Sequence, residues 1–197
     1  MKHGSLVAVK VPVFSFQKLI NVDVSLGPEM KSTGEVLGVD DNYEKALTKA
    51  FLGANYAFPK SGNILASIND RSKQECVELL KKFAELDFGI YATGDTAKYC
   101  TKNNLKVTAI KKSAIDEIQN KMKSGDITMV LNIPTHSKDP ERCGFQIRSL
   151  AQQYKVPCFT SPDTFNAYLT AMKTLNSHQE LTYDTINYYL NKKELLV

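Results

Sequence analysis

Lysines, hydroxyl groups and amides follow several short apolar runs in this sequence, and together they could bind a small anion. The segments that follow these runs are 69–73, 93–96, 111–113, 133–138 and 160–161. Thr93 and Thr96 offer hydroxyl and backbone donors at the start of a helix, and the lysines supply positive charge. Each segment alone is also typical of a plain helix cap or an exposed loop. The anion-site hypothesis therefore depends on all five segments meeting at one edge.

Lys73 carries an argument of its own. Ser72 and Glu75 have the spacing of a capping box, which predicts a helix with Lys73 in its first turn. The helix dipole disfavours a cation there by about 0.3–1 kcal/mol, and a bound anion would offset that cost. The alternative interpretation is that Lys73 is a solvated surface lysine.

The elements that position these segments alternate between strands and helices. Strands are predicted at 64–68, 89–92, 107–110, 129–132 and 158–160, and helices at 72–86, 96–103, 114–123, 145–154 and 162–173. Five strand–helix units in succession predict an α/β fold of the Rossmann type, with a five-stranded parallel sheet covered by helices on both faces. Ligands of such sheets lie outside the carboxyl ends of the strands, where all five polar segments fall.

A short α+β segment precedes this unit. Residues 6–14 alternate like a strand, and 41–54 show a helical stripe with Asp41 and Glu44 spaced as a capping box. The connector 59–63 contains proline and glycine, which predicts a boundary near residue 58. The tail, 181–196, is expected to end in a helix.

Composition excludes several functional classes. The formal charge of +4, from 25 basic and 21 acidic residues, is too small to indicate a nucleic-acid partner. No apolar run has the length of a membrane span or signal core, so we expect a cytoplasmic protein with reduced thiols. The four cysteines and three histidines lack ligand spacing, and no Gly-rich nucleotide motif is present. We therefore expect no disulfide, metal site, ATP site or catalytic triad.

Two stretches resemble a known family. Residues 26–39 (LGPEMKSTGEVLGV) and 46–53 (ALTKAFLG) are similar to the end of the second ATP-grasp synthetase half of the carbamoyl-phosphate synthase large chain. Residues 90–97 (IYATGDTA), the pair Leu131-Asn132 and 147–156 (IRSLAQQYKV) resemble that enzyme's C-terminal allosteric domain, which has a methylglyoxal-synthase-like fold. The resemblance runs from about Val7 to Lys173. It implies an ATP-grasp remnant at 1–58 and a methylglyoxal-synthase-like regulatory domain at 59–197.

The resemblance also implies a function. The full enzyme is a ligase that makes carbamoyl phosphate from bicarbonate, glutamine-derived ammonia and two ATP, for pyrimidine and arginine biosynthesis. This chain would be its regulatory end, without catalytic residues or cofactors of its own, because ATP, Mg and K would be used upstream. Its partners would be the upstream synthetase half, the glutaminase small subunit and an anionic effector of the UMP or IMP class. The implied effector contacts are Ser67, Lys73, Thr93, Thr96, Lys112 and Asn132, with Thr160 near an ornithine-linked contact.

Some positions differ from the family pattern, and two other functions stay open. Asp95 stands where nucleotide-binding relatives commonly have glycine, Pro134 replaces a threonine, and the loop after Lys112 is short. One alternative is a stand-alone methylglyoxal synthase-like lyase, although the Gly-Gly-Asp loop of that family is missing after the third strand. The other is an interaction domain that binds no effector.

Overall fold

A computed structural model describes residues 6–13, 34–134, 143–177 and 181–189. The chain divides into two compact units. Among the described residues, one unit comprises 6–13, 34–56, 167–177 and 181–189, and the other comprises 57–134 and 143–166. The predicted domains, 1–58 and 59–197, are based on the connector at 59–63 and on the family resemblance. The predicted domains therefore remain a prediction.

The larger unit contains a five-stranded parallel sheet, as predicted. Its strands lie in the order β5-β4-β3-β6-β7. Their bounds are Asn63–Ile68 for β3, Gly89–Thr93 for β4, Thr108–Ile110 for β5, Ile127–Ile133 for β6 and Cys158–Phe159 for β7. The chain moves outward from β3 to β5 and then returns to the other side of β3 to form β6. The strand order therefore reverses between β3 and β6, which is where open parallel sheets bind ligands.

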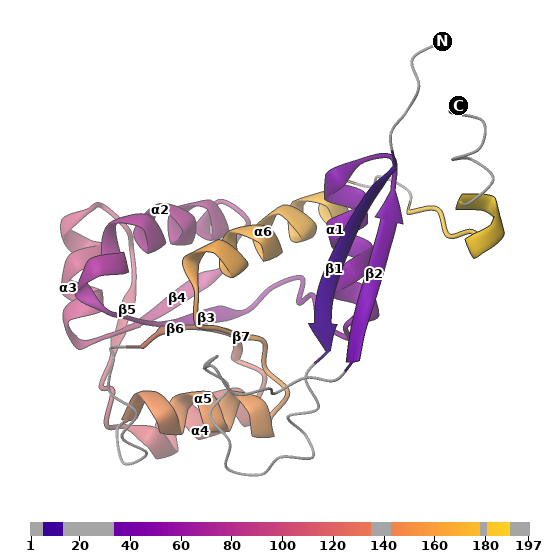
Figure 1. Cartoon of the computed structure of the whole chain (residues 1–197). Coiled ribbons are helices and arrows are strands. Elements are labelled where there is room, and N and C mark those ends of the chain that lie inside the picture. Colours follow the sequence, from indigo (N-terminus) through magenta and orange to yellow (C-terminus); the bar gives the residue numbers. More distant parts are fainter. Residues whose placement is uncertain (1–5, 14–33, 135–142, 178–180, 190–197) are drawn as a thin grey trace. The chain divides into compact units, whose positions relative to one another are not determined.

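Helices cover both faces of this sheet, which confirms the predicted α/β class. Figure 1 shows α2 and α3 on one face, and α4 and α5 on the other. The bounds are Lys73–Ala84 for α2, Gly94–Lys102 for α3, Ile115–Lys123 for α4 and Cys143–Gln153 for α5. Leu65 and Val130 of the sheet pack in one buried cluster with Ile118 of α4 and Ile147 of α5. Burial of these apolar side chains holds the sheet edge in place for the polar loops beyond it.

The predicted cap of α2 is wrong in detail. Ser72 precedes the helix, but its side chain makes no capping hydrogen bond. Instead, Asn69 Oδ1 accepts a hydrogen bond from the Ser72 amide at 3.0 Å and caps a 3₁₀ turn, η2 (Asp70–Ser72). The short amide side chain stabilises this turn before the α-helix begins. Lys73 is nevertheless the first residue of α2, as expected.

The smaller unit is an antiparallel ribbon with helices. β1 (Val7–Val13) pairs with β2 (Gly34–Asp40), and α1 (Tyr43–Gly53) follows. A Cβ at Gly38 would clash with the Ala46 carbonyl oxygen, so glycine is needed for α1 to approach β2. Asn42, not the predicted Asp41, caps α1, because its Oδ1 accepts from the Lys45 amide at 3.0 Å.

The remaining elements lie at the C-terminal end. The sixth α-helix, α6 (Pro162–Asn176), begins in the larger unit and ends in the smaller one. Of the expected tail helix, residues 186–189 are helical, while 190–196 lie outside the described residues. Residues 26–33 and 135–138 of the sequence motifs also lie outside them. Among the helices that are described, none combines the length and apolarity needed to cross a bilayer.

Candidate functional site

All seven predicted site residues are at or just beyond the carboxyl ends of the five strands. Ser67 and Asn132 each lie one residue before the end of a strand, and Thr93 is the last residue of β4. Lys73 and Thr96 are in the first turns of the helices that follow β3 and β4. The sheet therefore brings these five residues to the carboxyl ends of three adjacent strands, β4, β3 and β6.

The other two residues follow the two outermost strands of the sheet, β5 and β7. Lys112 follows β5 in an exposed turn, and the half-buried Thr160 follows β7. Adjacent strands are spaced by about 4.8 Å, so the two edge strands are roughly 19 Å apart. A single small anion bound near β3 cannot contact both residues. The structure thus groups five of the seven predicted residues more closely than the remaining two.

Ser67 and Asn132 form the centre of the carboxyl edge. They are directly opposite each other in the β3–β6 register, and both are buried. Beyond them, Asn69 Nδ2 donates a hydrogen bond to the Pro134 carbonyl oxygen at 2.9 Å. This bond ties the loop after β3 to the loop after β6 at the point where the strand order reverses.

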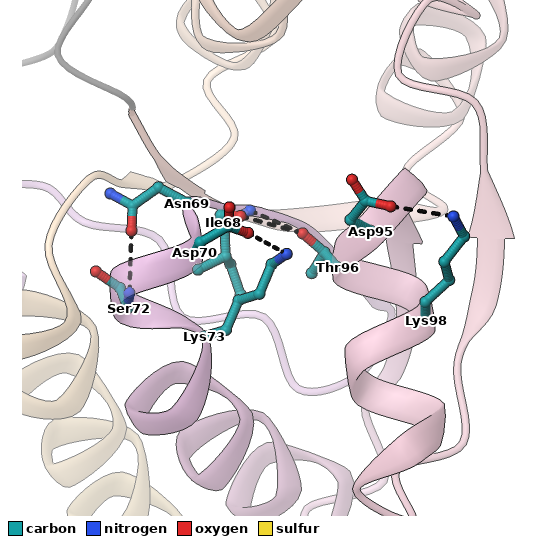
Figure 2. A network of polar contacts seen from close by, with 8 residues as sticks. All are labelled: Ile68, Asn69, Asp70, Ser72, Lys73, Asp95, Thr96 and Lys98. Atoms are coloured by element: carbon teal, nitrogen blue, oxygen red, sulfur yellow. Dashed lines mark hydrogen bonds and ion pairs between the residues drawn. The ribbon is translucent and has the colours of Figure 1, made fainter.

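The Thr96 hydroxyl is already engaged by the neighbouring strand (Figure 2). Its Oγ1 accepts from the Ile68 amide at 3.0 Å and is 3.4 Å from the Ile68 carbonyl oxygen, to which it can donate. The hydroxyl therefore fastens α3 to β3. For a ligand, the donors at this helix start are its first backbone amides, which are left free of intrahelical partners. Gly94 has φ +42°, and a Cβ there would meet nothing within 4 Å, so this turn is open on that side.

Lys73 is a buried lysine paired with an exposed carboxylate. Its side chain is 10% exposed, and Nζ lies 2.5 Å from Oδ1 of Asp70, whose side chain is 93% exposed. Figure 2 shows the Lys73 ammonium group between Asp70 and the start of α3. The cation stays at the dipole-disfavoured end of α2 with an acidic partner that solvent can reach from nearly every side. An incoming anion could therefore replace Asp70 without a large rearrangement.

The negative charge of Asp95 is offset by nearby lysines. Its Oδ1 lies 3.1 Å from Lys98 Nζ, and both side chains are largely exposed. The hydrogen bond from Lys98, together with the charges of Lys98 and Lys73, lowers the pKa of Asp95. The Asp95 carboxylate, which departs from the family pattern, is thus paired with Lys98, and the positive charge of Lys73 also stabilises it.

Arg148 was missed by the sequence analysis. It lies on α5, is 5% exposed, and its Nη1 donates to Asn132 Oδ1 at 2.9 Å. The signal was present, because Ile147 and Ala151 mark the buried stripe of this helix and Arg148 falls on the same side. A charged residue within such a stripe indicates a buried polar contact.

Polar residues also lie near the amino ends of the strands, but they form hydrogen bonds with one another. Asp126 accepts hydrogen bonds from Asn63 Nδ2 at 2.6 Å, Tyr91 Oη at 3.0 Å and Lys121 Nζ at 3.0 Å. Burial alone would raise the pKa of Asp126, yet the bonds from Lys121, Tyr91 and Asn63 lower it. The polar residues at the amino ends of the strands therefore need no ligand to account for their placement. Within the parts of the chain that are described, no three His, Cys, Asp or Glu side chains are grouped to hold a metal ion.

Comparison with known proteins agrees with the predicted resemblance. Residues 75–160 match the family model described as MGS-like domain. The chain is 41% identical over 189 residues to the carbamoyl phosphate synthase large chain of Clostridium acetobutylicum. These residues cover 95% of this chain and 18% of that protein. The large chain of Thermoanaerobacter pseudethanolicus is 45% identical over 168 residues, covering 85% of this chain and 15% of that protein.

Among solved structures, the crystal structure of methylglyoxal synthase from Elizabethkingia anophelis NUHP1 is similar, with 15% identity and a TM-score of 0.47. The match covers 67% of this chain and 92% of that chain. The present chain spans only 15–18% of the length of the large chains named above. Over 85–95% of its own length, the chain is therefore related in sequence to carbamoyl phosphate synthase large chains, and its residues 75–160 match the MGS-like domain.

Proposed function

We propose that this chain is a regulatory portion of a carbamoyl phosphate synthase large chain and that its carboxyl edge binds a small anionic effector. The observation that carries the proposal is the buried ammonium group of Lys73, held at a helix start by the exposed Asp70. Such a cation can exchange a surface carboxylate for the oxygens of a ligand at little cost. Phosphate is well suited, because it accepts several charge-assisted hydrogen bonds at once.

The surrounding donors favour a phosphorylated ligand. The first amides of α3 and the amide group of Asn132 lie at the ends of strands next to β3, which leads to Lys73. Backbone amides at a helix start and a lysine form a common phosphate-binding set. A nucleoside monophosphate such as UMP or IMP would place its phosphate there.

We further propose that the chain alone is not catalytic. The ligase activity, with its ATP, Mg and K, and the contact with a glutaminase small subunit would belong to the remainder of the large chain. The upstream synthetase half would be the partner whose states the effector biases, and such coupling is typically worth about 1–3 kcal/mol. The biosynthetic roles in pyrimidine and arginine formation and a cytoplasmic location belong to the same proposal.

The lyase alternative has no comparable support. A methylglyoxal synthase-like mechanism requires a carboxylate base after the third strand of the sheet. The segment 111–114 that follows β5 lacks the Gly-Gly-Asp loop of that family, and the next carboxylates, Asp116 and Glu117, are in the first turn of α4. An assay of phosphate release from dihydroxyacetone phosphate tests this point, and robust turnover would replace the regulatory proposal with a lyase.

Calorimetry on the whole chain tests the regulatory proposal. UMP, IMP, ornithine and N-acetylglutamate are titrated separately, and we expect heat of binding with at least one of the phosphate-bearing ligands. Lys73→Met is expected to weaken that binding about tenfold or more, since a hydrogen bond to a charged group is lost. Lys81→Met is the matched control, because Lys81 is on the same helix in an equivalent i,i+3 pair with Glu78. No binding of any of the four ligands would favour the interaction-domain alternative.

A further inference from the structure

The side-chain amide of Asn132 has a fixed orientation. Arg148 carries only donors and is always charged, so the Asn132 atom that faces its Nη1 at 2.9 Å must be the acceptor Oδ1. A flipped amide would place its NH₂ group against the guanidinium group. Nδ2 therefore points away from Arg148, and it lies 3.5 Å from the Gly144 carbonyl oxygen.

This arrangement leaves Asn132 with donor capacity. Nδ2 carries two protons, and the long contact to the Gly144 oxygen can use at most one of them. Asn132 lies directly opposite Ser67 in the register, at the carboxyl edge where the proposed ligand would be. A Cβ at Gly144 would lie 3.5 Å from Arg148 Nη1 and 3.8 Å from both polar atoms of the Asn132 amide, so all three residues are in close contact.

We propose that Arg148 is a positioning residue of the anion site, which holds Asn132 so that its Nδ2 serves as a donor. The inference rests on the proposed function, because it concerns the same ligand. A group fixed as a donor selects acceptors, so the ligand atom opposite Asn132 is a hydrogen-bond acceptor, such as a phosphate or carboxylate oxygen, and not an ammonium group. Arg148 acts through Asn132 without touching the ligand.

Asn132→Asp separates this role from a structural one. The carboxylate keeps an acceptor toward Arg148 and converts the contact into an ion pair, so the thermal midpoint is expected to equal or exceed that of the wild type. The donor is lost, however, and a negative charge faces the ligand. Binding of UMP and of inorganic phosphate is expected to weaken by about tenfold or more. Unchanged affinity in this folded variant would overturn the proposal.

Two substitutions at Arg148 complete the series. Arg148→Met removes the group that orients Asn132 and is expected to weaken UMP binding, while Arg148→Lys retains a cationic donor and is expected to restore part of the affinity. Equal affinity of the wild type and Arg148→Met would contradict the positioning role. If Arg148→Met does not fold, Asn132→Asp still decides the matter.

A measurement without ligand distinguishes failure of this inference from failure of the proposed function. In the wild type, we expect the Asn132 Nδ2 protons to give one sharp pair of resonances that exchanges slowly with solvent, and in Arg148→Met we expect broader lines and faster exchange. If neither UMP nor phosphate binds the wild type, the proposed function is overturned. If the Asn132 side-chain amide shows the same line widths and exchange rates in the wild type and in Arg148→Met, the positioning inference is overturned whatever the binding results are.

Discussion

Replacing Asp70 with asparagine is expected to tighten anion binding, although it removes an ion pair. In the wild type, Asp70 Oδ1 lies 2.5 Å from Lys73 Nζ, so the ligand must compete with Asp70 for the Lys73 ammonium group. The asparagine side chain would keep the size of the aspartate and one acceptor oxygen, and it would remove the competing charge. A gain of affinity is a sharper test than a loss, because few unspecific effects of a substitution improve binding.

The size of the gain follows from the exposure of Asp70. Its side chain is 93% exposed, so the pair with Lys73 resembles a surface ion pair on the acidic side. Such pairs contribute about 0.2–1 kcal/mol, which corresponds to about a 1.4- to 5-fold change in affinity. We therefore expect Asp70→Asn to lower the Kd for UMP by a factor in this range.

A double-mutant cycle measured by calorimetry tests the reasoning. Asp70→Asn is compared with the wild type, and then in the presence of Lys73→Met. The gain should vanish in the second comparison, since Asp70 competes only for Lys73. Weaker binding by Asp70→Asn, or a gain that persists without Lys73, would refute the view that Asp70 occupies the place of the ligand.

Three further outcomes are expected. Lys49→Met should cost about 3–5 kcal/mol in urea unfolding, because Lys49 and Asp40 form a buried pair 2.7 Å apart, whereas Lys10→Met at an exposed pair should cost less than about 1 kcal/mol. Burial alone would raise the pKa of Asp40, but hydrogen bonds from Lys49 and the Asp41 amide lower this pKa overall. The stability that the pair contributes is therefore present above about pH 4 and is lost as the pH falls further. A pH series of unfolding curves that shows no such loss would count against the pair. Burial raises the pKa of Cys76 to about 12, so iodoacetamide should modify Cys76 far more slowly than the half-buried Cys143, and equal rates in the native protein would contradict its burial.

The sheet could be predicted from the sequence because its signal is strong and repeated. Each strand is an apolar run, each helix has an apolar stripe, and turn residues separate them, so the α/β class follows from alternation alone. Strand β2 was not predicted, because Gly34 and Gly38 interrupt its apolar pattern and its burial comes from packing against α1. Pairing with β1 and packing against α1, which the local sequence pattern does not show, decided that element.

The helix caps and the buried partners of the site were harder to predict. Asn69 and Asn42 cap η2 and α1 in place of the expected Ser72 and Asp41, because several neighbouring polar residues can fill a cap and local geometry selects one. The engagement of the Thr96 hydroxyl by Ile68 depends on the distance between α3 and β3, which no sequence pattern records. Spacing along the chain therefore placed residues at the carboxyl edge, but it could not assign the partner of each side chain.

Anion binding at the carboxyl edge of the sheet is the central claim, and a nuclear magnetic resonance titration of the ¹⁵N-labelled chain with UMP tests it most directly. We expect shifts in the amides of 69–73 and 94–96 and in the side-chain amide of Asn132. The amides of Asn63 and Asp126, at the amino ends of the strands, serve as internal controls and should not move. Shifts confined to the amino ends, or no shifts at a saturating concentration of UMP, would contradict binding at the carboxyl edge.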